Sequence, residues 1–303
     1  MEVIRLPIPK SGNKSAIALG MFDGCHIGHR LLLCETVRYA RDNGLTAAVF
    51  TFSDDTAKKS MPMISSFDER LEHFLRLGIS TVYTVSFRNV RHFTPEDFVK
   101  QVLVGMCGAE IALCGTNFRF GKGAEGDADT LFALMQALGK EAVTVPPVRD
   151  SLVTVSSSEI RRAVASGDME RAARMLGTPF SLRGEVIPGK QLGRTLGFPT
   201  ANMVLPEGRL TPLTGVYYTE TVVDGRLYPS VTNIGTHPTV DMGAVCNAET
   251  HLIGFEGDLY RKPIEVRFLR YLRREKKFDS PEELREQLKK DKERARKEYE
   301  RSF

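Results

Sequence analysis

A change of periodicity near residue 177 is the feature that most constrains the fold of this chain. Before it, short apolar runs alternate with segments of helical spacing; after it, short alternating runs follow one another with turn residues between them. Strands interleaved with helices imply parallel pairing with right-handed crossovers. Successive short strands joined by turns imply antiparallel pairing instead. The sequence therefore predicts two domains of different class, at 1–178 and 179–303.

The first half is predicted to be an α/β domain with a doubly wound parallel sheet. Ser66 and Glu69 have capping-box spacing, Thr94 and Pro95 open another helix, and Gly44 is a plausible end for the first one. Strands are expected at 15–20, 45–52, 80–85, 110–115 and 141–148. Helices are expected at 28–44, 65–78 and 94–106.

The second half is predicted to be a small antiparallel β-barrel followed by a C-terminal helix. Runs at 181–189, 215–235, 248–260 and 262–273 read as short strands and turns with few helical periods, and Asp224-Gly225 is a strong hairpin signal. Ser280 and Pro281 open the last helix. Its mixed charges favour a solvated face over a tail that grips RNA.

Bulk composition describes an ordinary globular protein. The 303 residues carry 42 Lys and Arg against 38 Asp and Glu, a net charge of +4, which demands no nucleic-acid partner. The five cysteines lack C-x-x-C spacing, and neither a secretory start nor a run long enough to cross a bilayer is present. We expect a cytoplasmic protein with reduced thiols and no membrane partner, as a monomer or weak homo-oligomer.

The run GMFDGCHIGH, residues 20–29, joins the first expected strand to the first expected helix. Ligands of doubly wound sheets bind at this edge, where helix N-termini present free N–H groups to anions. Glycines allow close approach of the backbone, and His26 and His29 can donate hydrogen bonds to phosphate oxygens. This pattern fits nucleotidyl transfer. A zinc pair lacks the usual spacing and a further ligand, and a plain helix start does not explain two histidines.

Two further segments carry oxygens or cations suited to phosphates. Ser156 and Ser157 open a helix with Arg161 one turn in, although a single capping serine is the simpler alternative. Thr200 and Asn202 could meet Mg²⁺ and ATP phosphates. Glu249, in an expected strand, could accept a hydroxyl proton, or it could be an ordinary exposed carboxylate.

Two other glycine patterns carry less weight. A literal G-x-G-x-x-G runs from Gly121 to Gly126 but begins several residues past its strand, which disfavours a dehydrogenase. The run GEVIPGK at 184–190 continues with Gln191, so the hydroxyl that a phosphate-binding loop supplies to Mg²⁺ is missing.

Together, six runs spread over nearly the whole chain resemble the bacterial family of bifunctional riboflavin kinase/FAD synthetases. They are GMFDGCHIGH, CGTNFRFG, VSSSEIRRAVASGDMERAARMLGTPF, GKQLGRTLGFPTAN, GVYYTETVVDGRLYPSVTNIGTHPT and EGDLYRKPIEVRFLRYLRREKKFDS. The resemblance implies a nucleotidyltransferase domain of the H-x-G-H type that adenylylates FMN to FAD with release of pyrophosphate. It also implies a C-terminal barrel that phosphorylates riboflavin to FMN with ATP.

The resemblance also implies roles for particular residues, with ATP, riboflavin and FMN as substrates and Mg²⁺ as cofactor. The expected catalytic residues are Glu249, His26, His29 and Arg161. Thr200 and Asn202 would hold magnesium and nucleotide. The other expected binding positions are Gly20, Phe22, Asp23, Gly28, Asn117, Ser156, Ser157 and Gly193.

The chain departs from the family pattern after the second expected strand. Relatives show a T-F-x-P-H-P-like run there, whereas this chain reads TFSDDTAKKS. One alternative is therefore a riboflavin kinase with weak or lost adenylyltransferase activity, and another is a non-catalytic flavin sensor. His26 to His29 also spell the H-I-G-H of class I aminoacyl-tRNA synthetases, but no anticodon-binding region follows.

Overall fold

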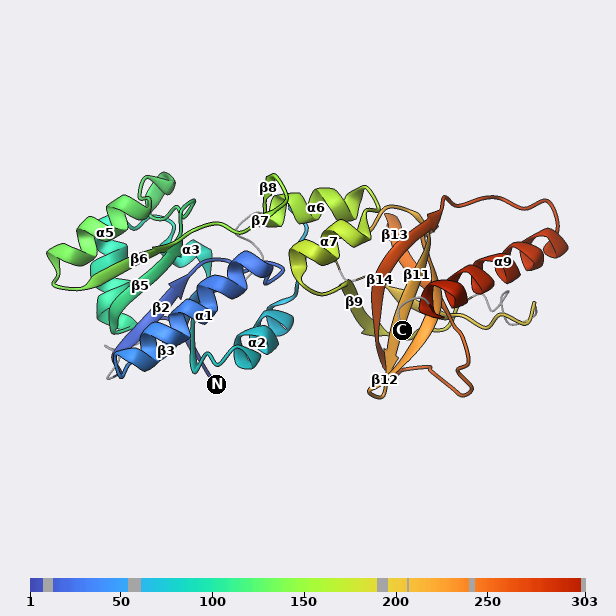
Figure 1. Ribbon diagram of the computed structural model, residues 1–303, viewed down its shortest axis with the longest axis horizontal. Coiled ribbons are helices and arrows are strands. Elements are labelled where there is room, and N and C mark those ends of the chain that lie inside the picture. The colour runs from blue at the N-terminus through green and yellow to red at the C-terminus, as the bar shows by residue number, and fades with distance from the viewer. Residues whose placement is uncertain (8–12, 54–60, 190–195, 206, 240–242, 301–303) are drawn as a thin grey trace. The chain divides into compact units, whose positions relative to one another are not determined.

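The computed structural model divides the chain into two compact units, residues 1–157 and residues 158–303 (Figure 1). It describes residues 1–7, 13–53, 61–189, 196–205, 207–239 and 243–300. Within these ranges, none of the helices has both the length and the apolar character needed to span a membrane.

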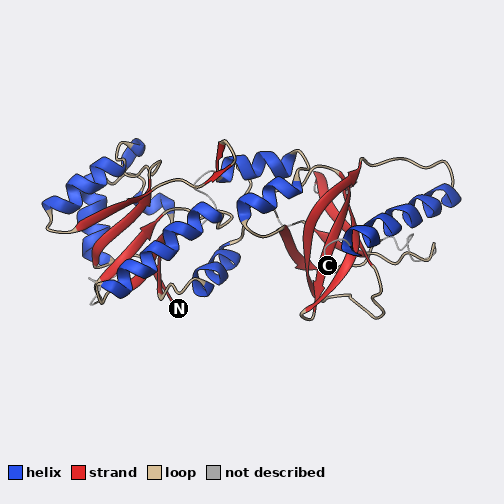
Figure 2. Ribbon diagram, in the orientation of Figure 1, coloured by secondary structure: helices blue, strands red, loops and turns tan. Residues whose placement is uncertain are grey.

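Unit 1 is built on a six-stranded sheet in which every pair of neighbouring strands is parallel (Figure 2). The strand order is β1-β4-β3-β2-β5-β6. The strands are β1 (Glu2–Arg5), β2 (Ser15–Leu19), β3 (Thr46–Phe52), β4 (Thr81–Val85), β5 (Ala109–Gly115) and β6 (Glu141–Val145). The prediction of a parallel α/β sheet is confirmed.

Both faces of this sheet are buried, because side chains alternate between two hydrophobic clusters along each strand. On β2, Ala16 and Ala18 join the cluster under α1 (Ile27–Asp42) and α2 (Phe67–Arg76). Ile17 and Leu19 join the opposite cluster, under η2 (Phe98–Met106) and α5 (Ala128–Ala137). The doubly wound arrangement follows directly from this alternation.

The helix starts read from the sequence are largely confirmed. Ser66 caps α2 and Glu69 completes the capping box, and Thr94 caps the short helix α4 (Pro95–Asp97). The helix that follows α4 is wider than the expected α-helix, because Cys107 N–H donates to Val102 O, five residues back, as in a π-helix. The elements of unit 1 that were not predicted are β1, α3 (Phe87–Val90), η3 (Lys122–Ala124), α5, β7 (Arg149–Asp150) and β8 (Val153–Thr154).

Unit 2 contains a six-stranded antiparallel sheet curled into a barrel, as predicted. The strand order is β10-β13-β12-β11-β14-β9. The strands are β9 (Phe180–Glu185), β10 (Ala201–Val204), β11 (Gly215–Val223), β12 (Arg226–Thr239), β13 (Gly243–Leu252) and β14 (Pro263–Arg273). Asp224 and Gly225 both have positive φ, which the tight β11–β12 turn requires.

One backbone bridge links the two edges of the barrel sheet. Ile187, just past β9, pairs with Asn202 of β10, and Ile187 N–H donates to Asn202 O at 2.8 Å. Phe180, Tyr217 and Phe268 fill the buried side. The predicted C-terminal helix, α9 (Pro281–Glu300), packs on the outer side of β11 and β12 through Ala295.

Two short helices, α6 (Ser157–Ala165) and α7 (Met169–Leu176), belong largely to unit 2. Leu213 N–H donates to Val164 O, and a Cβ on Gly167 would lie 3.3 Å from Tyr271, so the turn between the helices sits tightly against the barrel. The boundary between the compact units falls after Ser157, the first residue of α6. The boundary at 178 was a prediction about catalytic domains and stays one.

Candidate active sites

The glycine-rich run at 20–29 leaves the sheet at its switch point, where β2 pairs with β3 on one side and β5 on the other. Parallel strands end at the same edge, so Gly20 after β2 and Asn117 after β5 emerge side by side. Asn117 is exposed, and its side-chain oxygen folds back over Gly115. The fold thus brings together the run at 20–29 and Asn117, a binding position that the family resemblance implies.

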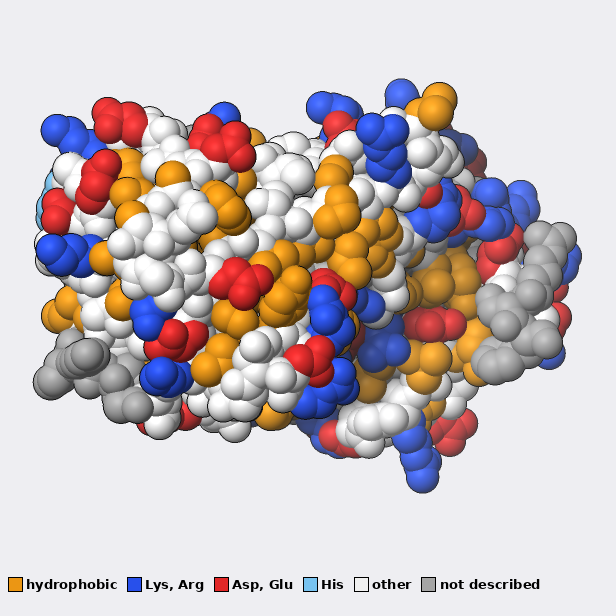
Figure 3. All heavy atoms as spheres, turned by 60° about the vertical axis from the view of Figure 1, so that its left-hand side comes forward, with side chains coloured by type: hydrophobic (Ala, Val, Ile, Leu, Met, Phe, Trp, Pro, Cys, Tyr) orange, Lys and Arg blue, Asp and Glu red, His pale blue; other side chains and the backbone are white. Residues whose placement is uncertain are grey.

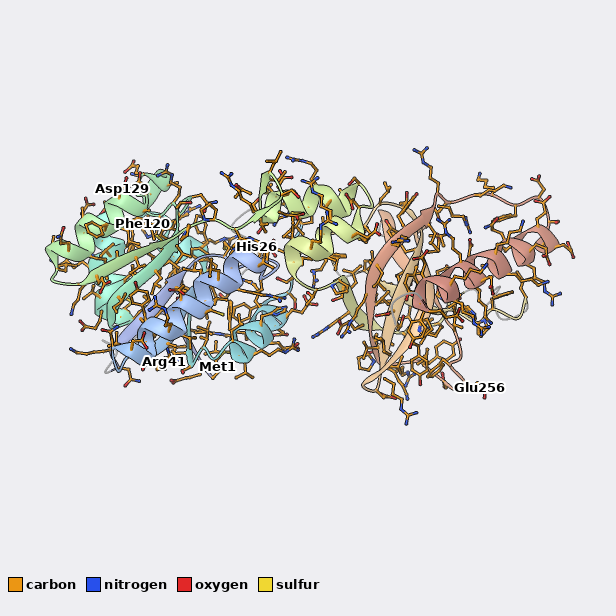
Figure 4. The ribbon with its side chains drawn as sticks, in the orientation of Figure 1. Met1, His26, Arg41, Phe120, Asp129 and Glu256 are labelled. Carbon is orange, nitrogen blue, oxygen red and sulfur yellow. The ribbon has the colours of Figure 1, made fainter. Side chains whose placement is uncertain are left out.

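His26 is the N-cap residue of α1 and lies at the opposite end of that helix from Arg41 (Figure 4). Its Nδ1 accepts a hydrogen bond of 3.2 Å from the backbone N–H of His29. An accepting Nδ1 carries no proton, so neutral His26 holds its proton on Nε2. The two imidazole rings are stacked, with centroids 3.5 Å apart and planes 17° apart.

Both imidazoles are held neutral. Burial lowers the pKa of His26 to about 4. Burial, reinforced by repulsion from a charged His26, holds the pKa of His29 well below its usual value. His29 Nδ1 is buried and has no hydrogen-bond partner among the described residues. The pair therefore offers neutral N–H donors, which can bind phosphate oxygens without carrying charge of their own.

Phe22 and Asp23 lie inside the unit rather than at its surface. Asp23 is 4% exposed, and one of its carboxylate oxygens accepts from the backbone N–H groups of Ile64 (3.0 Å) and Ser65 (3.1 Å). Phe22, fully buried at φ 53°, meets the ring of His29 edge-on at 5.3 Å. Both residues shape the loop around the histidines, and their direct contact with a ligand stays a prediction.

Arg70 of α2 contacts this loop and was not identified from the sequence. Its side chain is fully buried, and Nη1 donates to Met21 O at 2.8 Å and to Thr51 Oγ1 at 3.2 Å. The guanidinium therefore ties the start of the run at 20–29 to the end of β3. An arginine in an amphipathic helix is normally solvated, so no sequence signal distinguished it.

The serines at 156 and 157 are only partly brought to the same loop. Ser157 Oγ donates to Asp23 O at 3.0 Å, so the beginning of α6 is tied to the run at 20–29. Ser156 precedes α6 and is half-buried, and Arg161 lies one turn into α6 within unit 2. The roles of Ser156, Ser157 and Arg161 in binding phosphate stay predictions.

The depressed pKa of His26 predicts that unit 1 loses stability in mild acid. The unfolded chain binds a proton at this residue below about pH 6.5, whereas the folded chain binds it only below about pH 4. The contribution is complete above pH 6.5 and decreases as the pH falls toward 4. From pH 7 to 5 we expect His26 alone to remove about 2 kcal/mol from the free energy of unfolding, measured with urea.

His26→Asn is the matched control for this prediction, because asparagine caps a helix well and does not titrate in this range. The variant should show a pH dependence that is shallower by about the same 2 kcal/mol. Equal pH dependence in both proteins would contradict the assignment.

In unit 2, Asn202 and Glu249 are cross-strand partners. Asn202 of β10 lies opposite Glu249 of β13, and Asn233 of β12 lies opposite Glu249 on the other side. Directly opposite residues of antiparallel strands share a face, with Cβ atoms about 5 Å apart. The three polar side chains thus form a row across three neighbouring strands, each of them half-buried.

Gly189 lies against the side chain of Asn202. A Cβ at position 189 would collide with Asn202 Nδ2, so a larger residue there would displace this amide. Thr200 is half-buried just before β10. Gly193 lies outside the described residues, as does most of the TFSDDTAKKS run that departs from the family pattern.

Asn233 and Glu275 were not identified from the sequence. Asn233 Nδ2 donates to Glu275 Oε1 at 3.0 Å, which ties the segment between β14 and α9 to the polar row. Asn233 Oδ1 is buried without a hydrogen-bond partner among the described residues. The N-I-G-T-H-P-T run in which Asn233 lies was part of the family resemblance, and that was the available signal.

Comparison with known proteins follows the two-unit division. The family model described as FAD synthetase matches residues 8–159, and the model described as riboflavin kinase matches residues 176–299. A bifunctional riboflavin kinase/FMN adenylyltransferase from Bacillus subtilis is 34% identical over 292 residues, covering 93% of this chain and 92% of the relative. The Escherichia coli protein of the same description is 34% identical over 291 residues, covering 92% and 91%.

A solved structure shares the fold along almost the full length. It is a crystal structure described as a macrolide-efflux protein from Streptococcus pneumoniae, with a TM-score of 0.89 and 30% identity, covering 98% of this chain and 99% of that one. The fold and the two family models define an enzyme class in which an FAD synthetase-type α/β unit precedes a riboflavin kinase-type barrel. The chain belongs to the bifunctional riboflavin kinase/FMN adenylyltransferase family.

Proposed function

We propose that unit 2 transfers the γ-phosphate of ATP to the 5′-hydroxyl of riboflavin, giving FMN. The row of Asn202, Glu249 and Asn233 is the single observation that carries this proposal. Glu249 accepts the hydroxyl proton as the oxygen attacks phosphorus, and the bond from phosphorus to the bridging oxygen of ADP breaks. The adjacent Asn202 holds the nucleotide beside that carboxylate.

We further propose that unit 1 transfers AMP from a second ATP to FMN, giving FAD and pyrophosphate. The phosphate of FMN attacks the α-phosphorus of ATP, and pyrophosphate carries away the electron pair of the broken bond. His26 and His29 donate hydrogen bonds to the ATP phosphates, whose negative charge increases at the leaving group. Their stacked, neutral state and their place at the start of α1 support this role.

Thr200 and Asn202 are the proposed Mg²⁺ ligands. Hydroxyl and amide oxygens are hard donors of the kind that Mg²⁺ takes alongside nucleotide phosphates. Gly189 packs closely against the Asn202 amide, which supports a fixed position for this proposed ligand. Bound magnesium would neutralise charge on the transferred phosphate, while the protein side chains position the nucleotide.

We propose the cytoplasm as the location of the protein, with small molecules as its partners and no role for nucleic acid. Cys25, Cys107 and Cys114 are buried free thiols, as suits a reducing compartment. On the face seen in Figure 3, acidic and basic side chains are interspersed, which does not favour a polyanionic partner. A monomer or weak homo-oligomer remains our proposal for the oligomeric state.

One assay tests the proposed function. The protein is incubated with riboflavin, ATP and Mg²⁺, and riboflavin, FMN and FAD are then separated chromatographically. We expect both FMN and FAD. FMN alone would restrict catalysis to unit 2 and would support the kinase-only alternative, whereas neither product would contradict both activities.

Gly189→Ala should disable the kinase and spare the adenylyltransferase. The new methyl group would collide with the Asn202 amide and displace it, and small displacements of a positioning group cost about 10- to 100-fold in rate. Rates of FMN formation from riboflavin and of FAD formation from FMN measure the two effects separately.

Gly184→Ala is the matched control, because its Cβ would press on Met203 rather than on Asn202. It should lower the stability of the barrel and leave the kinase rate of the folded protein near that of wild type. Equal kinase losses in the two variants would show that strain, rather than the Asn202 amide, is responsible.

A further inference from the structure

His251 lies two residues beyond Glu249 on β13, so the two side chains share one face of the strand. It is only 9% exposed. Its Nδ1 is 2.9 Å from the backbone oxygen of Pro199, the residue that directly precedes Thr200. A single side chain therefore connects the strand that carries Glu249 to the segment that carries the proposed magnesium ligands.

The partner of Nδ1 fixes the tautomer of this ring. A carbonyl oxygen only accepts hydrogen bonds, so Nδ1 must carry the proton and donate it to Pro199. Burial lowers the pKa of His251, the Pro199 hydrogen bond opposes that shift, and the charge of Lys292 adds to it. Nε2 is buried without a hydrogen-bond partner among the described residues, so a second proton there would be unsatisfied.

The surroundings hold the ring in this orientation. Phe198, next to Pro199, meets it edge-on at a centroid distance of 5.4 Å. Lys292 of α9 lies 6.0 Å from the centre of the Phe198 ring. Pro199 has no N–H, so its carbonyl is the only backbone group with which it can be anchored. The hydrogen bond from His251 provides that anchor.

We propose that His251 is a positioning residue of the kinase site, whose Nδ1–H holds the Pro199 carbonyl and thereby fixes Thr200 and Asn202 relative to Glu249. This inference rests on the proposed kinase function of unit 2. The ring acts through Pro199 rather than on the substrate. Removing the His251 donor should therefore lower the affinity for MgATP and leave the affinity for riboflavin unchanged.

Two substitutions at position 251 separate the hydrogen bond from the packing of the ring. His251→Phe keeps a planar ring and loses the donor, and it should raise KM for MgATP about five- to tenfold, as expected for one net hydrogen bond. KM for riboflavin should stay at the wild-type value. His251→Asn places an amide N–H where Nδ1–H lies and should restore most of the affinity.

Wild-type KM for MgATP in His251→Phe would overturn the proposal, and so would an equal loss in His251→Asn. FAD formation from supplied FMN should be unchanged in both variants, which shows that unit 1 is intact.

An activity-free measurement distinguishes this inference from the proposed function. Imidazole ¹⁵N shifts of the wild-type protein, assigned to His251 by comparison with His251→Asn, should show a protonated Nδ1 and an unprotonated Nε2. The reverse tautomer would overturn the proposed contact. If the wild-type protein made no FMN, the proposed function would fail. The spectrum would still test the hydrogen bond from His251 to Pro199.

Discussion

Glu249→Gln should reduce FMN formation from riboflavin by about 10²- to 10⁴-fold, the usual contribution of a general base. Glutamine matches the size of glutamate and keeps one carbonyl oxygen, but it cannot take the proton that leaves the riboflavin hydroxyl. Asn202 and Asn233 on either side should stay in place, because the register of β10, β12 and β13 depends on backbone pairing. Single-turnover assays with riboflavin and MgATP measure the loss.

The first unit provides the internal control for Glu249→Gln. FAD formation from supplied FMN should proceed at the wild-type rate, because unit 1 carries its own site. Glu249→Asp, which keeps the carboxylate on a shorter side chain, should lie between wild type and glutamine. An unchanged kinase rate in Glu249→Gln would remove Glu249 from its proposed role as base.

His29→Ala should reduce FAD formation by about 10²- to 10³-fold, as expected when a preorganised donor to developing charge is removed. His29 is half-buried as a whole residue, although its Nδ1 is buried. FMN formation should be spared. Separate measurement of the two products from riboflavin, ATP and Mg²⁺ gives both rates in one experiment.

The helix cap should survive the substitution. His26 Nδ1 accepts from the backbone N–H of His29, a group that alanine retains. The urea midpoint of unit 1 should therefore change little. Loss of both FMN and FAD from a folded His29→Ala protein would contradict the assignment of the two reactions to separate sites.

Local sequence signals identified much of the fold. The capping box of Ser66 and Glu69 and the Asp224-Gly225 turn depend on neighbouring residues, and both are confirmed. The wide turns of η2 depend on tertiary packing instead, and α5 went unrecognised although Asp127 caps it. Signals that extend over three or four residues were readable, whereas packing between distant segments was not.

In the candidate sites, too, local patterns were readable from the sequence and contacts between distant segments were not. His26, Asn202 and Glu249 were marked by residue type and family resemblance, but only strand register places Asn202 beside Glu249. Arg70 and His251 donate hydrogen bonds to backbone carbonyls far away in the sequence, at Met21 and Pro199. Such contacts leave no local pattern, because any donor at the right point in space would serve.

The proposed kinase site lies at the junction where the two edges of the barrel sheet meet. Asn202 accepts the hydrogen bond that joins β10 to the segment after β9, and its side chain belongs to the polar row. A ligand bound by the Asn202 amide would therefore also stabilise the junction at which the barrel sheet closes. Ligand binding and the stability of unit 2 would then be thermodynamically linked. A variant that weakens the β9–β10 junction should bind the ligand less tightly, and saturating ligand should raise the free energy of unfolding of unit 2.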